Sequence, residues 1–178
     1  MIGFLKNPLR RFLEREDGSM VVPVALWTPV FLALIGSSIE LGTVTVRHTA
    51  LERSLDQAVR DLRLGTGGTS NDIIKEKICS SANILPDCMD KLHLEMVRLD
   101  LRDWSDPPAK AQCTDTAPEA ITPLRNFEHG GAHEMMMIRA CFKYQPITPA
   151  GMLGGSMKKD AQGYTAIIST TAFVHEPT

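Results

Sequence analysis

The chain has 178 residues, of which 43% are hydrophobic and 22% are charged, and its formal net charge at pH 7 is −2. From Gly18 onward the longest basic run is Lys158-Lys159, so the chain lacks the concentrated positive face that phosphate binding requires, and nucleic acid is not an expected partner. The length allows one small domain beside a membrane anchor.

Residues 1–18 form a basic leader, which precedes an uncharged run from Met20 to Ile39, MVVPVALWTPVFLALIGSSI. At ~1.5 Å of rise per residue, a helix of this length crosses about 30 Å of hydrocarbon, which predicts a transmembrane helix over 19–41. Pro23 falls in or next to the first turn, where proline is tolerated, whereas Pro29 predicts a bend.

The distribution of basic residues predicts the orientation of this span. The leader carries Lys6, Arg10, Arg11 and Arg15, whereas the first base after the span is Arg47. The leader is therefore expected in the cytoplasm and residues 42–178 are expected to be exported. A cleaved secretory signal with its site at Gly36/Ser38 is the alternative, although its apolar core would be unusually long.

An amphipathic helix is expected to continue from the span to about Leu64, where Gly65 ends it. Its apolar stripe recurs at steps of three and four residues, and His48 on this stripe is interpreted as a packed, hydrogen-bonded residue rather than a ligand. The stripe comprises Val44, His48, Leu51, Leu55, Ala58 and Leu62.

The rest of the chain predicts one further helix and three strands. Ser70 to Asp72 can cap a helix that runs to about Ser81. Strands are expected over 92–101, with a bulge near Met96/Val97 where the apolar parity changes, over Met135–Tyr144, and over Tyr164–Val174. Within Met135–Met137, alternate residues are expected to be buried. Irregular segments are expected over 105–131 and 146–163. The predicted fold class is α+β, a long helix packed on a small antiparallel sheet.

Four cysteines, Cys79, Cys88, Cys113 and Cys141, lie on the side predicted to be exported. An even number in an oxidising compartment favours two disulfides, and of the three possible pairings we prefer Cys79–Cys88 with Cys113–Cys141. Zinc is the competing interpretation, but the nine-residue spacing of the first two cysteines is unlike a zinc knuckle.

Motifs that would indicate an enzyme are missing from the sequence: it has no nucleotide-binding glycine loop, nucleophile elbow or zinc-protease helix. We therefore expect neither an enzyme nor a cofactor. His129 and His133 have a four-residue spacing, but the two glycines between them favour a loop over a metal site. Asp100, Asp103 and Asp106 around Trp104 are interpreted as a solvated rim, with calcium binding as the alternative. Apolar residues in segment 146–163 either form a docking patch or fold back onto the core.

The order of these features resembles the TadE/TadG-like family of the tight-adherence (Flp-type) pilus system, whose members are pseudopilin-like. The likeness rests on Phe12–Leu41 (FLEREDGSMVVPVALWTPVFLALIGSSIEL), Arg47, Leu51–Val59 and Arg63–Gly65, with weaker support from Cys141–Pro149. It implies a pilin-like fold and cleavage by a prepilin peptidase between Gly18 and Ser19. The chain departs from the family at Pro23, where pilin-like members usually carry a glutamate.

The resemblance implies a single-pass protein of the bacterial inner membrane that acts as a minor pseudopilin or assembly component, with other pilus subunits and the secretion platform as partners. In this interpretation the span packs against neighbouring helices and Leu51, Leu55 and Leu62 extend the contact outside the bilayer. The alternative is a membrane-tethered binding module that engages calcium or a glycan near Asp100–Asp106 and the segment 146–163.

Overall fold

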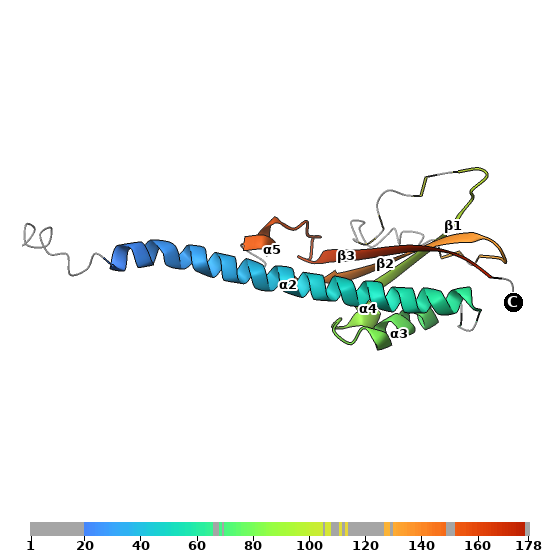
Figure 1. The fold of residues 1–178 in the computed structure, drawn as a ribbon, viewed down its shortest axis with the longest axis horizontal. Coiled ribbons are helices and arrows are strands. Elements are labelled where there is room, and N and C mark those ends of the chain that lie inside the picture. Colours follow the sequence, from blue (N-terminus) through green and yellow to red (C-terminus); the bar gives the residue numbers. More distant parts are fainter. Residues whose placement is uncertain are drawn as a thin grey trace, which may run out of the picture.

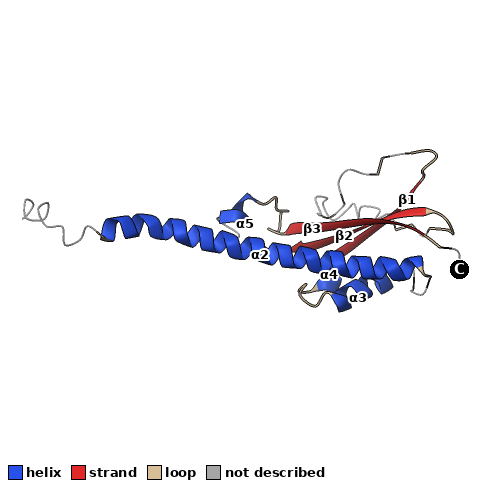
Figure 2. Ribbon diagram, in the orientation of Figure 1, coloured by secondary structure: helices blue, strands red, loops and turns tan. Residues whose placement is uncertain are grey.

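The fold was analysed in a computed structural model, which describes residues 20–65, 68, 70–104, 106–107, 111, 113, 127–128, 130–148 and 152–176. It is an α+β fold in which one long helix, α2 (Val21–Arg63), runs along a three-stranded antiparallel sheet (Figures 1 and 2). The leader, with Gly18 and Ser19, lies outside the described residues, as does His129.

Helix α2 has 43 residues and continues without interruption past Pro29. Pro23 is its third residue, where the missing amide costs little because the first amides of a helix lack partners in any case. The helix ends as the sequence predicts. The amide of Gly65 donates to the carbonyl of Leu62, and Gly65 adopts a φ of 64°, which glycine accepts without strain.

Two shorter helices follow α2. Helix α3 (Asn71–Ser81) begins at Ser70, whose hydroxyl accepts a hydrogen bond from the Ile73 amide at 3.4 Å, so the predicted cap is confirmed. The single-turn helix α4 (Cys88–Lys91) leads directly into the first strand. Helix α3 packs against α2, and the two helices together lie over one face of the sheet (Figure 1).

The sheet has the order β1 (Leu92–Leu99), β2 (Met135–Tyr144), β3 (Thr165–Val174). The predicted bulge at Met96/Val97 is wrong, because the β1–β2 pairing runs continuously from Leu92↔Phe142 to Leu99↔Met135. Met96 faces the helices, and Val97 lies half-buried on the far face. The apolar residues of β1 switch from even to odd positions near Met96/Val97 because both faces of the sheet are partly covered, and not because a residue is inserted.

The central strand shows the same two-sided burial. Met136 and Met137 point to opposite faces and are both buried, so the alternate burial predicted for Met135–Met137 is wrong. Since β2 has a strand on each side and cover on both faces, few of its positions can reach water.

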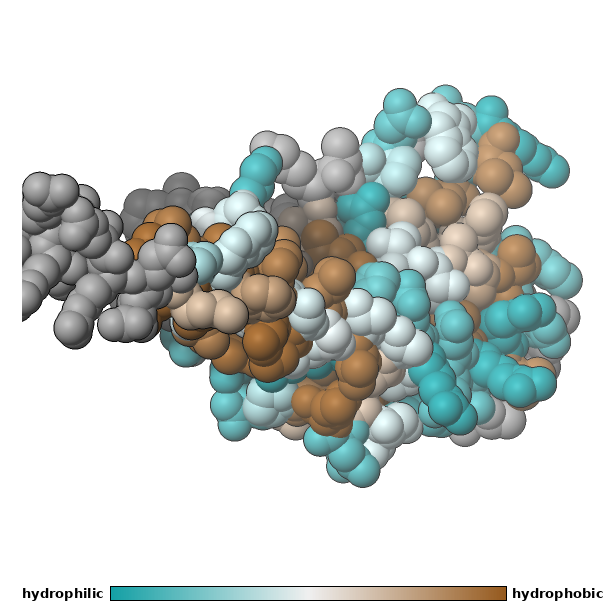
Figure 3. Space-filling model, turned by 60° about the vertical axis from the view of Figure 1, so that its left-hand side comes forward, coloured by the Kyte–Doolittle hydropathy of each residue, from teal (hydrophilic) through white to brown (hydrophobic). Residues whose placement is uncertain are grey.

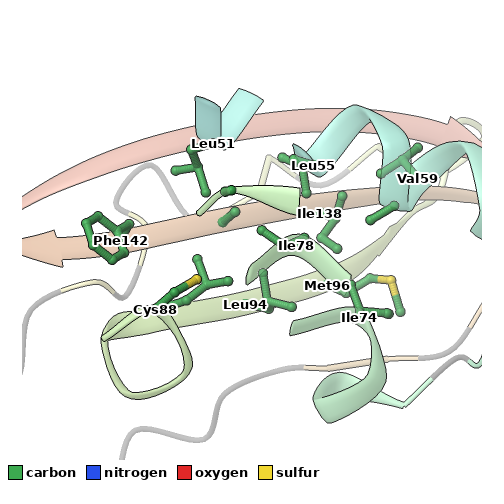
Figure 4. Packing of buried hydrophobic residues seen from close by; sticks show 14 of the residues in the cluster. Leu51, Leu55, Val59, Ile74, Ile78, Cys88, Leu94, Met96, Ile138 and Phe142 are labelled. Carbon is green, nitrogen blue, oxygen red and sulfur yellow. The ribbon is translucent and has the colours of Figure 1, made fainter. Parts of the chain in front are cut away.

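The core lies between the helices and the near face of the sheet (Figure 4). Leu51, Leu55 and Val59 of α2 belong to one buried cluster with Ile74 and Ile78 of α3 and with a row of residues from the sheet. This row includes Leu94, Met96, Ile138 and Phe142. The second half of α2 is thus an integral part of the domain core.

The segment 146–163, expected to be irregular, contains a short helix, α5 (Met152–Ser156), which packs against α2. The segment therefore contacts the long helix through α5, while Ile147 remains 54% exposed. Most of the segment 105–131 lies outside the described residues.

Candidate functional site

The first half of α2 is an exposed apolar rod. Within Val21–Arg63 an 18-residue window has a mean hydropathy of 1.8 and none of its residues is buried, so by length and composition the helix could cross a membrane. Figure 3 shows apolar residues gathered at the end nearest the leader and hydrophilic residues over the domain. The exposed apolar residues include Val24, Leu26, Trp27, Phe31, Leu34, Ile35 and Ile39.

One side of this rod is not fully exposed. Ala33, Gly36 and Ser37 are partly covered, and Glu40 is 1% exposed. These four residues recur at helical spacing, so they form one face, and α5 packs against α2 in this region (Figure 1). The α+β domain therefore contacts the apolar part of the helix on the N-terminal side of residue 41, the expected boundary of the span.

The contact is fixed by the buried carboxylate of Glu40. Its Oε2 accepts hydrogen bonds from the backbone amide of Thr148 at 3.0 Å and from the Thr148 hydroxyl at 3.2 Å. Among the residues that the structure describes, the other oxygen, Oε1, is buried and has no hydrogen-bond partner. A buried carboxylate must be hydrogen-bonded to be tolerated, so this pair determines where the segment after β2 attaches to α2.

Tyr144 and Arg47 lie next to the Glu40 contact, on the side of the sheet. The Arg47 guanidinium lies 5.2 Å from the centre of the Tyr144 ring. Burial, together with the nearby Glu40 carboxylate, raises the pKa of the Tyr144 phenol, and Arg47 acts in the opposite direction. The Tyr144 hydroxyl donates to the Met157 sulfur at 3.7 Å, which ties the end of β2 to the residue after α5.

We expect that replacing Glu40 by alanine releases this attachment while the distal sheet remains folded. The Thr148 amide would lose its partner, a loss of roughly 1–3 kcal/mol, so its hydrogen-exchange rate should rise roughly 10- to 100-fold. Mass-spectrometric exchange on the full chain measures this. The matched control is Glu52→Ala, since Glu52 is half exposed and forms only a 3.7 Å pair with His48. Equal exchange at Thr148 in both variants would contradict the role of Glu40.

Leu51, Leu55 and Leu62, expected to form a contact with neighbouring helices, are all buried inside this chain's own core. They pack against α3 and the sheet and are not available to another subunit in this conformation. His48 lies at the rim of the core, where its Nε2 is 3.3 Å from the carbonyl oxygen of Ile168. It is thus hydrogen-bonded as expected, but its side chain remains 41% exposed.

Both disulfides adopt the pairing preferred from the sequence. Cys79–Cys88 joins α3 to α4, and Cys113–Cys141 joins a residue of the 105–131 segment to the far face of β2. Next to the second bridge, Glu95 and Arg139 form a largely buried pair at 3.8 Å beside His93. The cavity there holds about 10 Å³, room for a single water molecule at most and not for a substrate.

The acidic residues around Trp104 accept hydrogen bonds from nearby backbone amides and from the Trp104 indole. Asp100 Oδ1 accepts from the amides of Arg102 and Asp103, which lowers the pKa of its carboxyl, and the Trp104 indole donates to Asp106 at 2.8 Å. In the described part of the chain no group of three metal-ligating side chains is found. The arrangement agrees with a solvated rim.

His133 sits in a tight turn beside this rim. It has a φ of 67° and its amide donates to the His175 carbonyl oxygen. Glu134 accepts from the Gly131 amide and pairs with Arg98 at 2.8 Å, and both contacts lower the pKa of the Glu134 carboxyl. These residues lie where Leu99, Met135 and Val174 pair, whereas the segment 146–163 follows Tyr144 at the other end of the sheet. The described residues of the two regions suggested for calcium or glycan binding therefore lie at opposite ends of the sheet.

An open groove of about 650 Å³ runs between α2 and β3, lined by Arg53, Asp56, Arg60 and residues Thr171–Phe173. Its charges are mixed in sign and its shape is shallow, so it does not define a substrate pocket.

Comparison of this chain with protein-family models, curated proteins and solved structures finds no match.

Neither the Glu40–Thr148 pair nor α5 was predicted from the sequence. A signal was present: Glu40 directly follows the apolar run, and the residues from Gln145 to Met157 contain no charge. Neither feature by itself indicates that the two segments meet.

Proposed function

We propose that this chain is a single-pass protein of the bacterial inner membrane, with the leader in the cytoplasm and the α+β domain exported, and that it acts as a minor pseudopilin or assembly component of a Tad/Flp-type adhesion pilus. Its role is to pack against other subunits, not to catalyse a reaction. The likeness of residues 12–65 to the TadE/TadG-like family and the architecture of the long helix support the proposal.

The observation that carries the proposal is the division of one continuous helix into two halves. The first half of α2 is apolar and exposed, and the second half is buried in the domain core. A helix of 43 residues is about 65 Å long, so it can cross a bilayer and still hold a domain rigidly outside it. This is the arrangement that a pilin-like subunit needs to be inserted as a rod among its neighbours.

The surface left for neighbouring helices differs from the sequence-based expectation. Because the leucines of the second half are buried within the domain, intermolecular contacts must use the span. Phe31 and Ile35 lie on the side of α2 opposite the covered face of Gly36 and Glu40, and both are exposed. Helices associate in membranes by close van der Waals packing, for which this side is available.

Photo-crosslinking in cells tests the proposal. Phe31, which is 59% exposed, is replaced by the photoreactive aromatic residue p-benzoylphenylalanine. Illumination should yield a covalent adduct with a pilus subunit, identified by mass spectrometry, because the span packs against other subunits. The adduct should disappear in a strain that lacks the other pilus subunits.

An adduct that persists unchanged in that strain, or none in a piliated strain with the protein in its membrane, would contradict the pilus assignment. The Gly18→Ala variant supplies a separate readout. If a prepilin peptidase cuts after Gly18, the wild-type chain loses its leader and the variant keeps it.

A further inference from the structure

The connection between β2 and β3 has an unusual composition. It contains thirteen consecutive uncharged residues, from Gln145 to Met157, followed by Lys158-Lys159. We refer to its described residues, Gln145–Thr148 and Met152–Lys158, as the α5 loop. Ile147 is 54% exposed although it is the most apolar kind of residue, and Lys158 is exposed as well. The described part of the connection thus combines an exposed apolar side chain with a basic one, the two residue types that favour a membrane interface.

The position of the α5 loop along α2 is known from its contacts. Thr148 is bonded to Glu40, which directly follows the last residue of the uncharged run. Helix α5 lies beside the apolar half of α2 (Figure 1), and the partly covered face of α2 extends to Ala33. Ala33 is roughly 10 Å from Glu40 along the helix axis, on the side of the leader.

This position has a consequence for a chain that spans a bilayer. If Met20–Ile39 fills the hydrocarbon layer, the α5 loop lies at the outer boundary of that layer or beneath it. We infer that the α5 loop is a second membrane contact, which inserts Ile147 and α5 at the boundary between acyl chains and headgroups and places Lys158 near lipid phosphates. This inference rests on the proposed membrane span of α2.

The internal contacts of the loop suit this location. Thr148 satisfies its amide and hydroxyl at Glu40, so neither remains open to lipid. A Cβ added at Gly154 would collide with the Thr148 carbonyl oxygen, so α5 is folded tightly against the start of the loop. Irregular backbone near a hydrocarbon layer is tolerated when it packs against protein in this way.

Tryptophan quenching by brominated lipids tests the inference, because bromine quenches only indoles that touch the acyl chains. The full chain is reconstituted in vesicles of phosphatidylcholine and phosphatidylglycerol whose acyl chains are brominated near the headgroup. Three variants each retain one tryptophan: Trp104→Phe keeps Trp27 in the span, Trp27→Phe keeps Trp104, and the third combines Ile147→Trp with both of these substitutions. Trp104 is 56% exposed, a close match to Ile147, and lies at the far end of the sheet.

We expect quenching and a blue-shifted emission for the Ile147→Trp variant, comparable with those of Trp27, and no quenching of Trp104. Quenching of Trp27 with an unquenched Ile147→Trp variant would overturn the inference and leave the membrane span intact. Absence of quenching at Trp27 would instead overturn the span itself, and with it the proposed function. Because Ile147 is exposed, its replacement does not disturb the core, and circular dichroism of the three variants verifies this.

Discussion

Replacing Leu55 by alanine is expected to destabilise the α+β domain by about 2–5 kcal/mol, the range for a fully buried leucine. Leu55 is 0% exposed and lies at the centre of the contacts between α2, α3 and the sheet. Chemical denaturation of the detergent-solubilised chain, followed by the circular dichroism of the sheet, measures the change. The loss follows from the apolar contacts removed and from the cavity that remains.

The control is the same substitution in the apolar half of the same helix. Leu34 is 61% exposed, so Leu34→Ala should change the stability of the domain by less than about 0.5 kcal/mol. Equal stabilities of the two variants would mean that the second half of α2 is not part of the core, and would restore Leu51, Leu55 and Leu62 as an intermolecular contact.

The sequence predicted those parts of the fold that depend on local chemistry. The stop at Gly65 follows from glycine's tolerance of a positive φ, and the start of α3 follows from the hydroxyl of Ser70. The strand Met135–Tyr144 has the predicted limits because a run of apolar and β-branched residues indicates a strand wherever it is buried. The short spacing of Cys79 and Cys88 favoured the observed disulfide pairing, although it left the other two pairings possible.

The remainder depends on contacts between distant segments. Glu40 and Thr148 are 108 residues apart, and no periodicity links a carboxylate at the end of a span to a threonine between two prolines. A bulge is predicted at Met96/Val97 only if one face of the sheet is buried and the other faces water. Val97 and Met137 lie on the far face and are partly or fully buried, so that face is covered as well. The apolar stripe of α2 likewise predicts burial but not which molecule supplies the other surface, and in this structure Leu51, Leu55 and Leu62 are buried in the chain's own core.

Loss of the Cys113–Cys141 disulfide is expected to cost more stability than loss of Cys79–Cys88. The bridges close loops of 28 and 9 residues, and chain entropy then predicts about 3.6 and about 2.6 kcal/mol. The location of the bridges predicts the same order of stability losses. Cys113–Cys141 attaches the segment around Cys113 to the far face of the sheet, which neither α2 nor α3 contacts. Removal of both bridges should cost roughly 6 kcal/mol, which is comparable with the entire stability of many domains.

Paired substitutions by alanine measure these costs, because replacing both cysteines of a bridge leaves no free thiol to form a wrong disulfide. Urea unfolding of each paired variant should give a lower midpoint for Cys113→Ala/Cys141→Ala than for Cys79→Ala/Cys88→Ala, and the variant without either bridge should be largely unfolded at room temperature. The reverse order would show that the far face holds together without its bridge. In that case the α3–α4 turn, whose Cys88 is buried beside Ile78 and Leu92, would be the part of the core that depends on a covalent link.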